Sequence, residues 1–202
     1  MKLLVATDAH IFRTPDGRHW AKSIYGYSFW TRYLGVFDSV RIVARIKDVQ
    51  KIETKDLLVD GDGVEIAGIP FYQGPRQLLR QYVKIQRELK GIDDGCDAAL
   101  LRMPSQTATM VWKHLKKGIP LAGEVVYDMM DDVNLPGQNP IIKMLHVIIS
   151  NNVKKFCFEA NGVSYVTEST IQRHYPSYAR LHGESKEHFE SHYSTITLSD
   201  NA

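Results

Sequence analysis

The chain has 202 residues, 44% hydrophobic and 24% charged, so it can bury a full core and resembles an ordinary folded domain in composition. Its net charge of +2 is too small to indicate a nucleic-acid-binding protein. No apolar run approaches the roughly 18 residues of a membrane span, and Asp8 interrupts the first apolar run too early for a signal peptide. The sequence therefore predicts a cytoplasmic location and leaves peripheral contact with the inner face of the membrane open. Cys96 and Cys157 lie far apart, and we expect both to be reduced and buried.

The first hundred residues alternate short apolar runs with helical patterns. Residues 2–7 read as a buried strand, and residues 25–34 as a helix rich in aromatic side chains that pack in the core. Further strands are predicted at 39–44, 57–59 and 64–71. This alternation is typical of an α/β protein with a doubly wound, mostly parallel sheet that has helices on both faces.

A polar loop is predicted over residues 13–20, beyond the carboxyl end of the first strand. Turn residues Pro15, Asp16 and Gly17 lie at its centre, His19 lies near its end, and Asp8 and His10 precede it. Two interpretations remain open for this segment. It is either a surface hairpin or a binding loop over a cleft.

The next helix begins at Pro75. We expect Leu78, Leu79, Tyr82, Val83 and Leu89 to face inward. The basic residues of this helix share an outward face; they are Arg76, Arg80, Lys84 and Arg87. This face is either a solvated surface or a surface that binds phosphate or an anionic membrane.

Residues 97–128 predict a strand, a helix and a second strand, the unit around which the chain is organised. The helix begins near Pro104 and Ser105 and ends at Gly118. Such a unit joins parallel strands by a right-handed crossover. It places Arg102, Ser105, Glu124 and Asp128 near the carboxyl ends of those strands, where open α/β sheets bind ligands.

The last third of the chain predicts a loop at 129–139, a long helix from Pro140, and a short strand at 163–166 followed by a brief helix. The stripe of Ile142, Leu145, Ile149, Val153 and Phe156 on the long helix predicts core packing. Residues 179–202 have little apolar content. We therefore divide the chain into a Rossmann-like domain, residues 1–178, and a polar tail or start of a linker, residues 179–202.

Generic nucleotide and hydrolase motifs are missing. The sequence has no GxGxxG after its first strand, no GxxxxGK[ST] and no GxSxG. No close Cys/His spacing indicates a metal site. The predicted sheet instead gathers polar side chains that either hydrogen-bond sugar hydroxyls and move protons or form structural ion pairs: Asp8, His10, Asp16, His19, Arg102, Ser105, Glu124 and Asp128.

The segments 102–105 (RMPS), 118–120 (GIP) and 124–128 (EVVYD) resemble the N-terminal half of family 4-type glycosyltransferases. Residues 160–168 (ANGVSYVTE) and 172–176 (QRHYP) add to the resemblance, which runs from Met1 to about Pro176.

The resemblance implies the GT-B architecture, in which two Rossmann-like domains face each other across a cleft. The first domain binds the acceptor, a saccharide or lipid-linked saccharide, and the second holds the nucleotide sugar. This chain would supply only the first domain, with residues 193–198 (YSTITL) starting the connection to the missing one. Family members retain the anomeric configuration and need no metal or other cofactor, and cell-surface polysaccharide assembly is their usual setting.

The same resemblance implies roles for residues. Arg102 and Ser105 would face the reacting sugar, and Arg102 and Glu124 are the predicted catalytic pair. Glu124 and Asp128 would orient acceptor hydroxyls or hold the loop. The predicted substrate-binding residues are Asp8, His10, Asp16, Gly17, His19, Ser105 and Asp128.

Two other classes of protein remain open from the sequence. One is a self-contained small α/β enzyme, such as a methyltransferase or a hydrolase. The other is a non-catalytic interaction module of flavodoxin-like shape.

Overall fold

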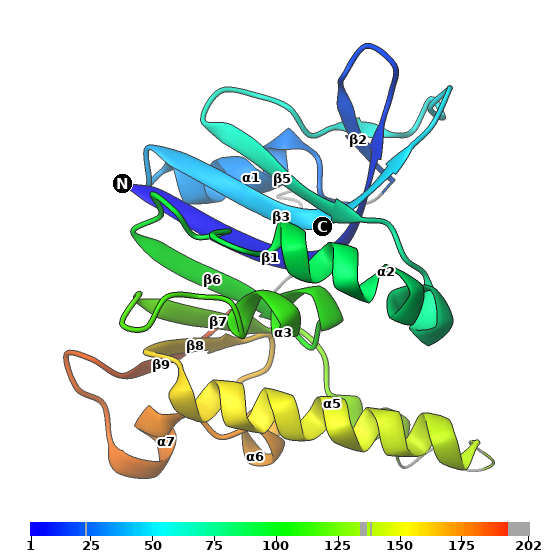
Figure 1. Cartoon of the computed structure of the whole chain (residues 1–202). Coiled ribbons are helices and arrows are strands. Elements are labelled where there is room, and N and C mark those ends of the chain that lie inside the picture. Colours follow the sequence, from blue (N-terminus) through cyan, green and yellow to red (C-terminus); the bar gives the residue numbers. More distant parts are fainter. Residues whose placement is uncertain (23, 134–136, 138, 194–202) are drawn as a thin grey trace, which may run out of the picture. The chain divides into compact units, whose positions relative to one another are not determined.

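A computed structural model describes residues 1–22, 24–133, 137 and 139–193 of the chain (Figure 1). Two compact units make up the chain, and each is discontinuous in sequence. The N-terminal unit comprises Met1–Leu100 and Ser105–Ile119, and the C-terminal unit comprises Leu101–Pro104 and Pro120–Ala202. The predicted α/β class with mostly parallel strands is confirmed, whereas the predicted boundary at residue 178 stays a prediction.

The N-terminal unit is built on a mixed sheet. Parallel pairing joins β1 to β3 and β3 to β5, and antiparallel pairing joins β1 to β2 and β2 to β4. Its strands are β1 (Lys2–Arg13), β2 (His19–Ala21), β3 (Ser39–Asp48), β4 (Leu57–Leu58) and β5 (Val64–Pro70). Its helices are α1 (Tyr27–Leu34), α2 (Gly74–Glu88) and α3 (Gln106–Trp112).

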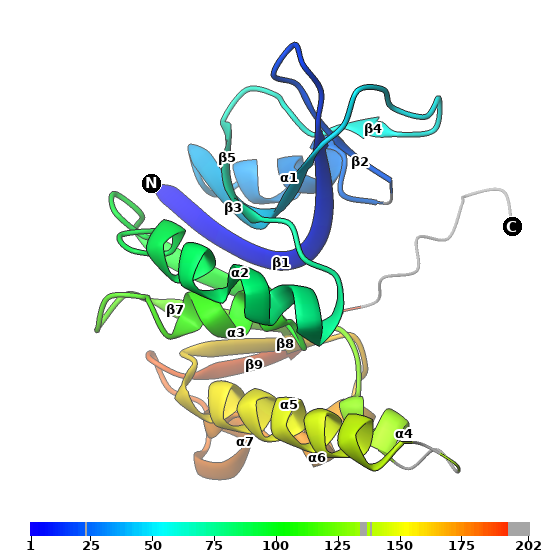
Figure 2. The same cartoon turned by 45° about the vertical axis from the view of Figure 1, so that its right-hand side comes forward.

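Helices cover both faces of this sheet, as Figures 1 and 2 show. Leu3 and Val5 of β1 share a buried cluster with Phe29 and Trp30 of α1. Leu4 is equally buried on the opposite face, because successive side chains of a strand point to opposite sides. A strand buried on both faces needs a nearly continuous apolar sequence, which is why β1 and β3 were predicted.

A bulge interrupts β1. Between Ala6 and His10 the strand advances four residues while β3 advances two, from Val43 to Arg45. The sequence prediction ended this strand at Thr7 because polar Asp8 follows. The structure corrects it: Asp8 lies in the bulge and β1 continues to Arg13.

The C-terminal unit has three strands in parallel register: β7 (Leu121–Val125), β8 (Gly162–Tyr165) and β9 (Phe189–His192). Its helices are α4 (Met129–Val133), α5 (Pro140–Glu159), α6 (Thr170–His174) and α7 (Tyr178–His182). Strand β6 (Ala98–Met103) is divided: Ala98–Leu100 belongs to the N-terminal unit and Leu101–Met103 to the C-terminal unit.

Several elements differ from their predictions. Helix α4 occupies part of the predicted 129–139 loop, and α7 and β9 lie after residue 177, where no element was predicted. Of the predicted 193–198 connection only Tyr193 is described; the rest lies outside the described residues. On α5, Val153 and Phe156 are buried as predicted, but Ile142 is 46% exposed.

Helix α2 also corrects its prediction. Ile85 and the following Leu89 are buried, whereas Leu79, Tyr82 and Val83 are exposed, against the predicted inward face.

Candidate functional site

The carboxyl ends of four strands meet at one edge of the C-terminal unit (Figure 1). Three backbone hydrogen bonds join them, from Val126 N–H to the Met103 carbonyl (2.8 Å), from Val166 N–H to the Val125 carbonyl (3.2 Å), and from Tyr193 N–H to the Tyr165 carbonyl (2.9 Å). Each bond links residues at or just past the ends of neighbouring strands β6, β7, β8 and β9. Ligands of open α/β sheets bind at such an edge.

A buried ion pair lies at this edge. Nη1 of Arg102, at the end of β6, contacts Oε2 of Glu124, at the end of β7, and the two side chains are only 6% and 11% exposed. The hydroxyl of Tyr193, just past β9, hydrogen-bonds the same carboxylate oxygen at 3.4 Å. Since a buried charge needs a partner, this pair fixes both side chains in place.

A second polar pair lies at the same edge. Nδ1 of His174, at the end of α6, is 2.6 Å from Oδ2 of Asp128. The other carboxylate oxygen, Oδ1, accepts the backbone N–H of Met130 at 2.9 Å. The Asp128 side chain is buried, but the His174 side chain is 44% exposed. The carboxylate therefore orients a half-exposed imidazole, which is the arrangement of a proton-transfer or hydroxyl-binding group.

Two buried tyrosines support the α6 segment beneath this pair. The Tyr165 hydroxyl donates to the Tyr175 carbonyl at 2.6 Å, and the Tyr175 hydroxyl is 3.3 Å from Oγ of Ser150. Burial, together with the nearby Asp128 charge, raises the pKa of Tyr175 to about 12. Both tyrosines thus stay neutral and hold the backbone next to His174.

In the N-terminal unit, Asp8 is bound to the start of α3. Its carboxylate accepts the backbone N–H groups of Gln106 (3.2 Å) and Thr107 (3.3 Å) and the Thr107 hydroxyl (2.9 Å). Ser105 caps the same helix, with Oγ accepting the Ala108 N–H at 2.9 Å. These contacts satisfy amides that a helix start leaves without partners, so Asp8 and Ser105 have structural roles here.

Arg45 and Tyr72 complete the surroundings of Asp8. The Arg45 guanidinium donates to the Asp8 carbonyl (2.6 Å) and the Tyr72 carbonyl (3.1 Å), and lies over the Tyr72 ring. Burial raises the pKa of Tyr72 to about 12. Burial, followed by the positive charge of Arg45, lowers the pKa of His10, whose ring packs against Phe71.

The segment that was predicted as a loop over residues 13–20 forms a tight turn between β1 and β2, which is the hairpin alternative. The Thr14 hydroxyl donates to Asp16 Oδ1 at 2.5 Å, and Gly17 takes a positive φ of 83°. His19 lies within β2, and its Nδ1 is 2.8 Å from Oδ1 of Asp60. Asp16 and Gly17 therefore shape the turn, and His19 joins β2 to the segment after β4.

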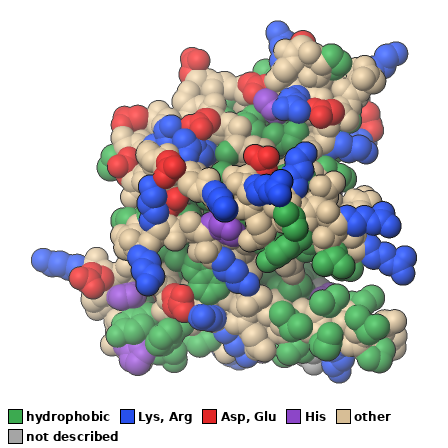
Figure 3. Space-filling view, in the orientation of Figure 1, with side chains coloured by type: hydrophobic (Ala, Val, Ile, Leu, Met, Phe, Trp, Pro, Cys, Tyr) green, Lys and Arg blue, Asp and Glu red, His purple; other side chains and the backbone are tan. Residues whose placement is uncertain are grey.

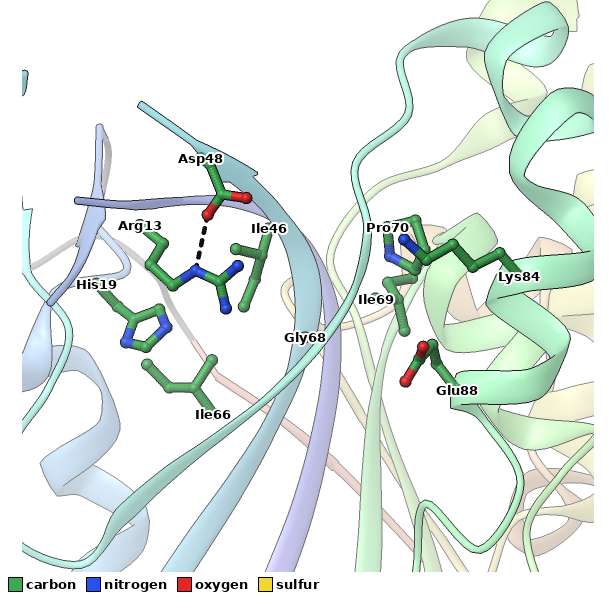
Figure 4. Close-up of a pocket in the computed structure, with 10 residues that line it drawn as sticks. All are labelled: Arg13, His19, Ile46, Asp48, Ile66, Gly68, Ile69, Pro70, Lys84 and Glu88. Atoms are coloured by element: carbon green, nitrogen blue, oxygen red, sulfur yellow. Dashed lines mark hydrogen bonds and ion pairs between the residues drawn. The ribbon is translucent and has the colours of Figure 1, made fainter. Parts of the chain in front are cut away.

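A cavity of about 370 Å³ opens beside His19 (Figure 4). Arg13 and Asp48, at the ends of β1 and β3, form an ion pair on one side, and Lys84 and Glu88 of α2 lie on the other. The whole lining consists of Arg13, His19, Ile46, Asp48, Ile66, Gly68, Ile69, Pro70, Lys84 and Glu88. Charges of both signs over an apolar floor suit a small polar ligand.

The predicted site residues thus separate into two groups. Arg102, Glu124 and Asp128 gather at the strand ends of the C-terminal unit, whereas Asp8, His10, Asp16, Gly17, His19 and Ser105 belong to the N-terminal unit. Sequence reasoning did not single out His174 or Tyr193. His174 belongs to residues 172–176, which are part of the resemblance described above. Its position in the brief helix that follows a predicted strand could have identified it as a candidate site residue.

No three His, Cys, Asp or Glu side chains among the described residues are arranged to hold a metal ion. None of the described helices has both the length and the apolar composition needed to cross a membrane. Both cysteines are free; Cys157 is buried and Cys96 is half-buried.

The chain is 28% identical over 182 residues to Protein CapJ of Staphylococcus aureus. The match covers 87% of this chain but only 44% of that protein, so the chain spans less than half the length of this curated relative. No protein-family profile matches the chain.

Proposed function

We propose that this chain is the acceptor-binding half of a retaining GT-B glycosyltransferase, which transfers a sugar from a nucleotide sugar to a saccharide or lipid-linked acceptor in polysaccharide biosynthesis. The observation that carries the proposal is the meeting of Arg102, Glu124, Asp128, His174 and Tyr193 at one edge of the C-terminal unit. Polar groups of this kind recognise sugar hydroxyls. The resemblance of residues 102–128 to family 4-type enzymes and the match to Protein CapJ support it.

The His174–Asp128 pair and the Arg102–Glu124 pair would have different roles. His174 is half-exposed and held through Nδ1, and no described residue hydrogen-bonds its Nε2, so Nε2 would contact an acceptor hydroxyl. Asp128 would keep the imidazole in that orientation. Arg102 and Glu124 remain the proposed catalytic residues. Because they are paired and buried, a sugar would reach either one only by replacing its partner.

The donor side would come from a second domain. Protein CapJ is more than twice as long as the matched segment, which agrees with a further domain in a complete enzyme. In the complete protein, closure of the two domains would exclude water and align acceptor with donor. The isolated chain should therefore bind acceptor weakly and transfer no sugar.

The test combines binding and turnover on the 202-residue chain. Saturation-transfer NMR with a panel of oligosaccharides should detect binding, and His174→Gln should weaken it about tenfold or more, the loss of a hydrogen bond to a half-buried polar group. His182→Gln on α7 is the matched control and should leave binding unchanged. A panel of nucleotide sugars with the bound oligosaccharide should give no product.

Three results would contradict the proposal. Clear sugar transfer by the chain alone would rule out a half-enzyme. Saccharide binding that His174→Gln leaves intact would move the site elsewhere. A rise in melting temperature with S-adenosylmethionine, without any saccharide binding, would favour a methyltransferase.

A further inference from the structure

Helix α2 presents an unusual outward face. Leu79, Tyr82 and Val83 are 77%, 47% and 63% exposed, at the spacings of three and four residues that place side chains on one side of a helix. Ile85 and the following Leu89 fill the inward side. The exposed apolar residues are therefore not required for the core of the unit.

A strip of positive charge runs beside this apolar strip. At 100° per residue, Arg76, Arg80 and Arg87 fall next to Val83 on the outward side. All three and Lys84 are exposed, and among the described residues none of the four pairs with a carboxylate. Glu88 is the single acidic residue of α2. Figure 3 shows hydrophobic and basic side chains together over this helix.

We propose that α2 docks the protein on an anionic lipid surface. Exposed leucine and valine would enter the boundary between headgroups and acyl chains, tyrosine would sit at headgroup level, and the arginines would contact lipid phosphates. The charge is complementary to such a surface and unpaired within the described chain, which separates α2 from a helix face that merely awaits another protein. The helix has 15 residues, so it lies on the membrane and does not span it.

Helix α5 offers the natural comparison. Its first half also exposes apolar residues, including Ile141 and Ile148. The first ten residues of α5, all of them described, contain one lysine, Lys143, one histidine, His146, and no arginine. Apolar exposure without dense charge does not identify a lipid partner. The α5 face therefore serves as a control surface.

The test is co-sedimentation of the full chain with vesicles of phosphatidylglycerol and phosphatidylcholine. We expect binding to mixed vesicles, little binding to pure phosphatidylcholine, and weakening as salt rises. Arg76→Glu with Arg80→Glu should lower the partition coefficient by at least about 30-fold, the ratio supplied by two basic side chains at an anionic surface. Lys113→Glu with Lys117→Glu changes the net charge equally, in the same unit, and should have a much smaller effect.

Apolar variants complete the design. Leu79→Ser with Val83→Ser should also release the protein from vesicles, whereas Ile141→Ser with Ile148→Ser should not. Equal loss with the Lys113 and Lys117 variant would reduce the effect to net charge and overturn the proposal. So would loss of binding only with the α5 variant, or binding to a short DNA duplex that is as tight and needs neither Leu79 nor Val83.

Discussion

The two units use the carboxylates of their sheets in opposite ways. In the N-terminal unit, the Asp8 carboxylate accepts hydrogen bonds from two backbone amides and one hydroxyl at the start of α3. In the C-terminal unit, Asp128 keeps one oxygen for a backbone amide and uses the other to orient half-exposed His174. One carboxylate, inside a strand, therefore stabilises the start of a helix, whereas the other, past the end of a strand, orients a half-exposed side chain.

The sharpest way to test this comparison is to break one ion pair in each unit. Glu124→Gln leaves the Arg102 guanidinium buried without its negative partner, so we expect the free energy of unfolding to fall by about 3–5 kcal/mol. Asp48→Asn in the solvent-exposed pair with Arg13 should change it little, because water solvates both groups. Urea denaturation measures both. Similar losses in the two variants would show that the Arg102–Glu124 pair is not buried as described.

Two glycines extend the comparison to packing. A Cβ on Gly123 would lie 2.3 Å from Cε1 of buried Phe156, and a Cβ on Gly68 would lie 2.3 Å from Cδ1 of Ile46. The Phe156 ring has no room to move, so Gly123→Ala should destabilise by about 1–3 kcal/mol. The Ile46 methyl can turn into the cavity that it lines with Gly68, so Gly68→Ala should cost less.

Thermal unfolding and urea denaturation of both glycine variants check this expectation. Equal destabilisation would mean that the cavity next to Gly68 gives Ile46 no freedom.

The smallest expected effect concerns pH. The pKa of His10 is lowered from 6.5 in the folded chain, so as pH falls below about 6.5 the unfolded chain takes up this proton first. The free energy of unfolding should therefore decrease as the pH falls, until the pH is also below the pKa of His10 in the folded chain. His10→Gln should remove this part of the pH dependence. Denaturation between pH 7.5 and 5 measures the difference in slope, and an unchanged slope would show that His10 is not the group responsible.

Much of the fold could be predicted from the sequence because its central strands are buried on both faces. The runs at residues 2–7, 39–44 and 121–126 are almost continuously apolar, and each matches an observed strand. Strand β2 has only three residues, too few to show a pattern, and β9 is mostly polar, so neither can be distinguished from a loop by its sequence. The inward face of α2 was misassigned because its exposed strip is as apolar as a core strip.

The candidate site was predictable only in part, for a related reason. Arg102, Glu124 and Asp128 follow or end predicted neighbouring strands, so the topology alone brings them to one edge. His174 and Tyr193 reach that edge from a short helix and from the end of a strand that the sequence did not reveal. The bulge that holds Asp8 and its contact with the start of α3 depend on tertiary structure, so the sequence did not predict them.

The divided strand β6 has a practical consequence for anyone cutting or recombining this gene. A fragment that starts at Pro120 would lack Leu101–Pro104 and with them Arg102, leaving Glu124 without its counterion. A fragment that stops at Leu100 would lack α3, to which Asp8 is anchored. Neither unit can therefore be transferred to another protein without the other. Recombination breakpoints within residues 98–120 should be selected against.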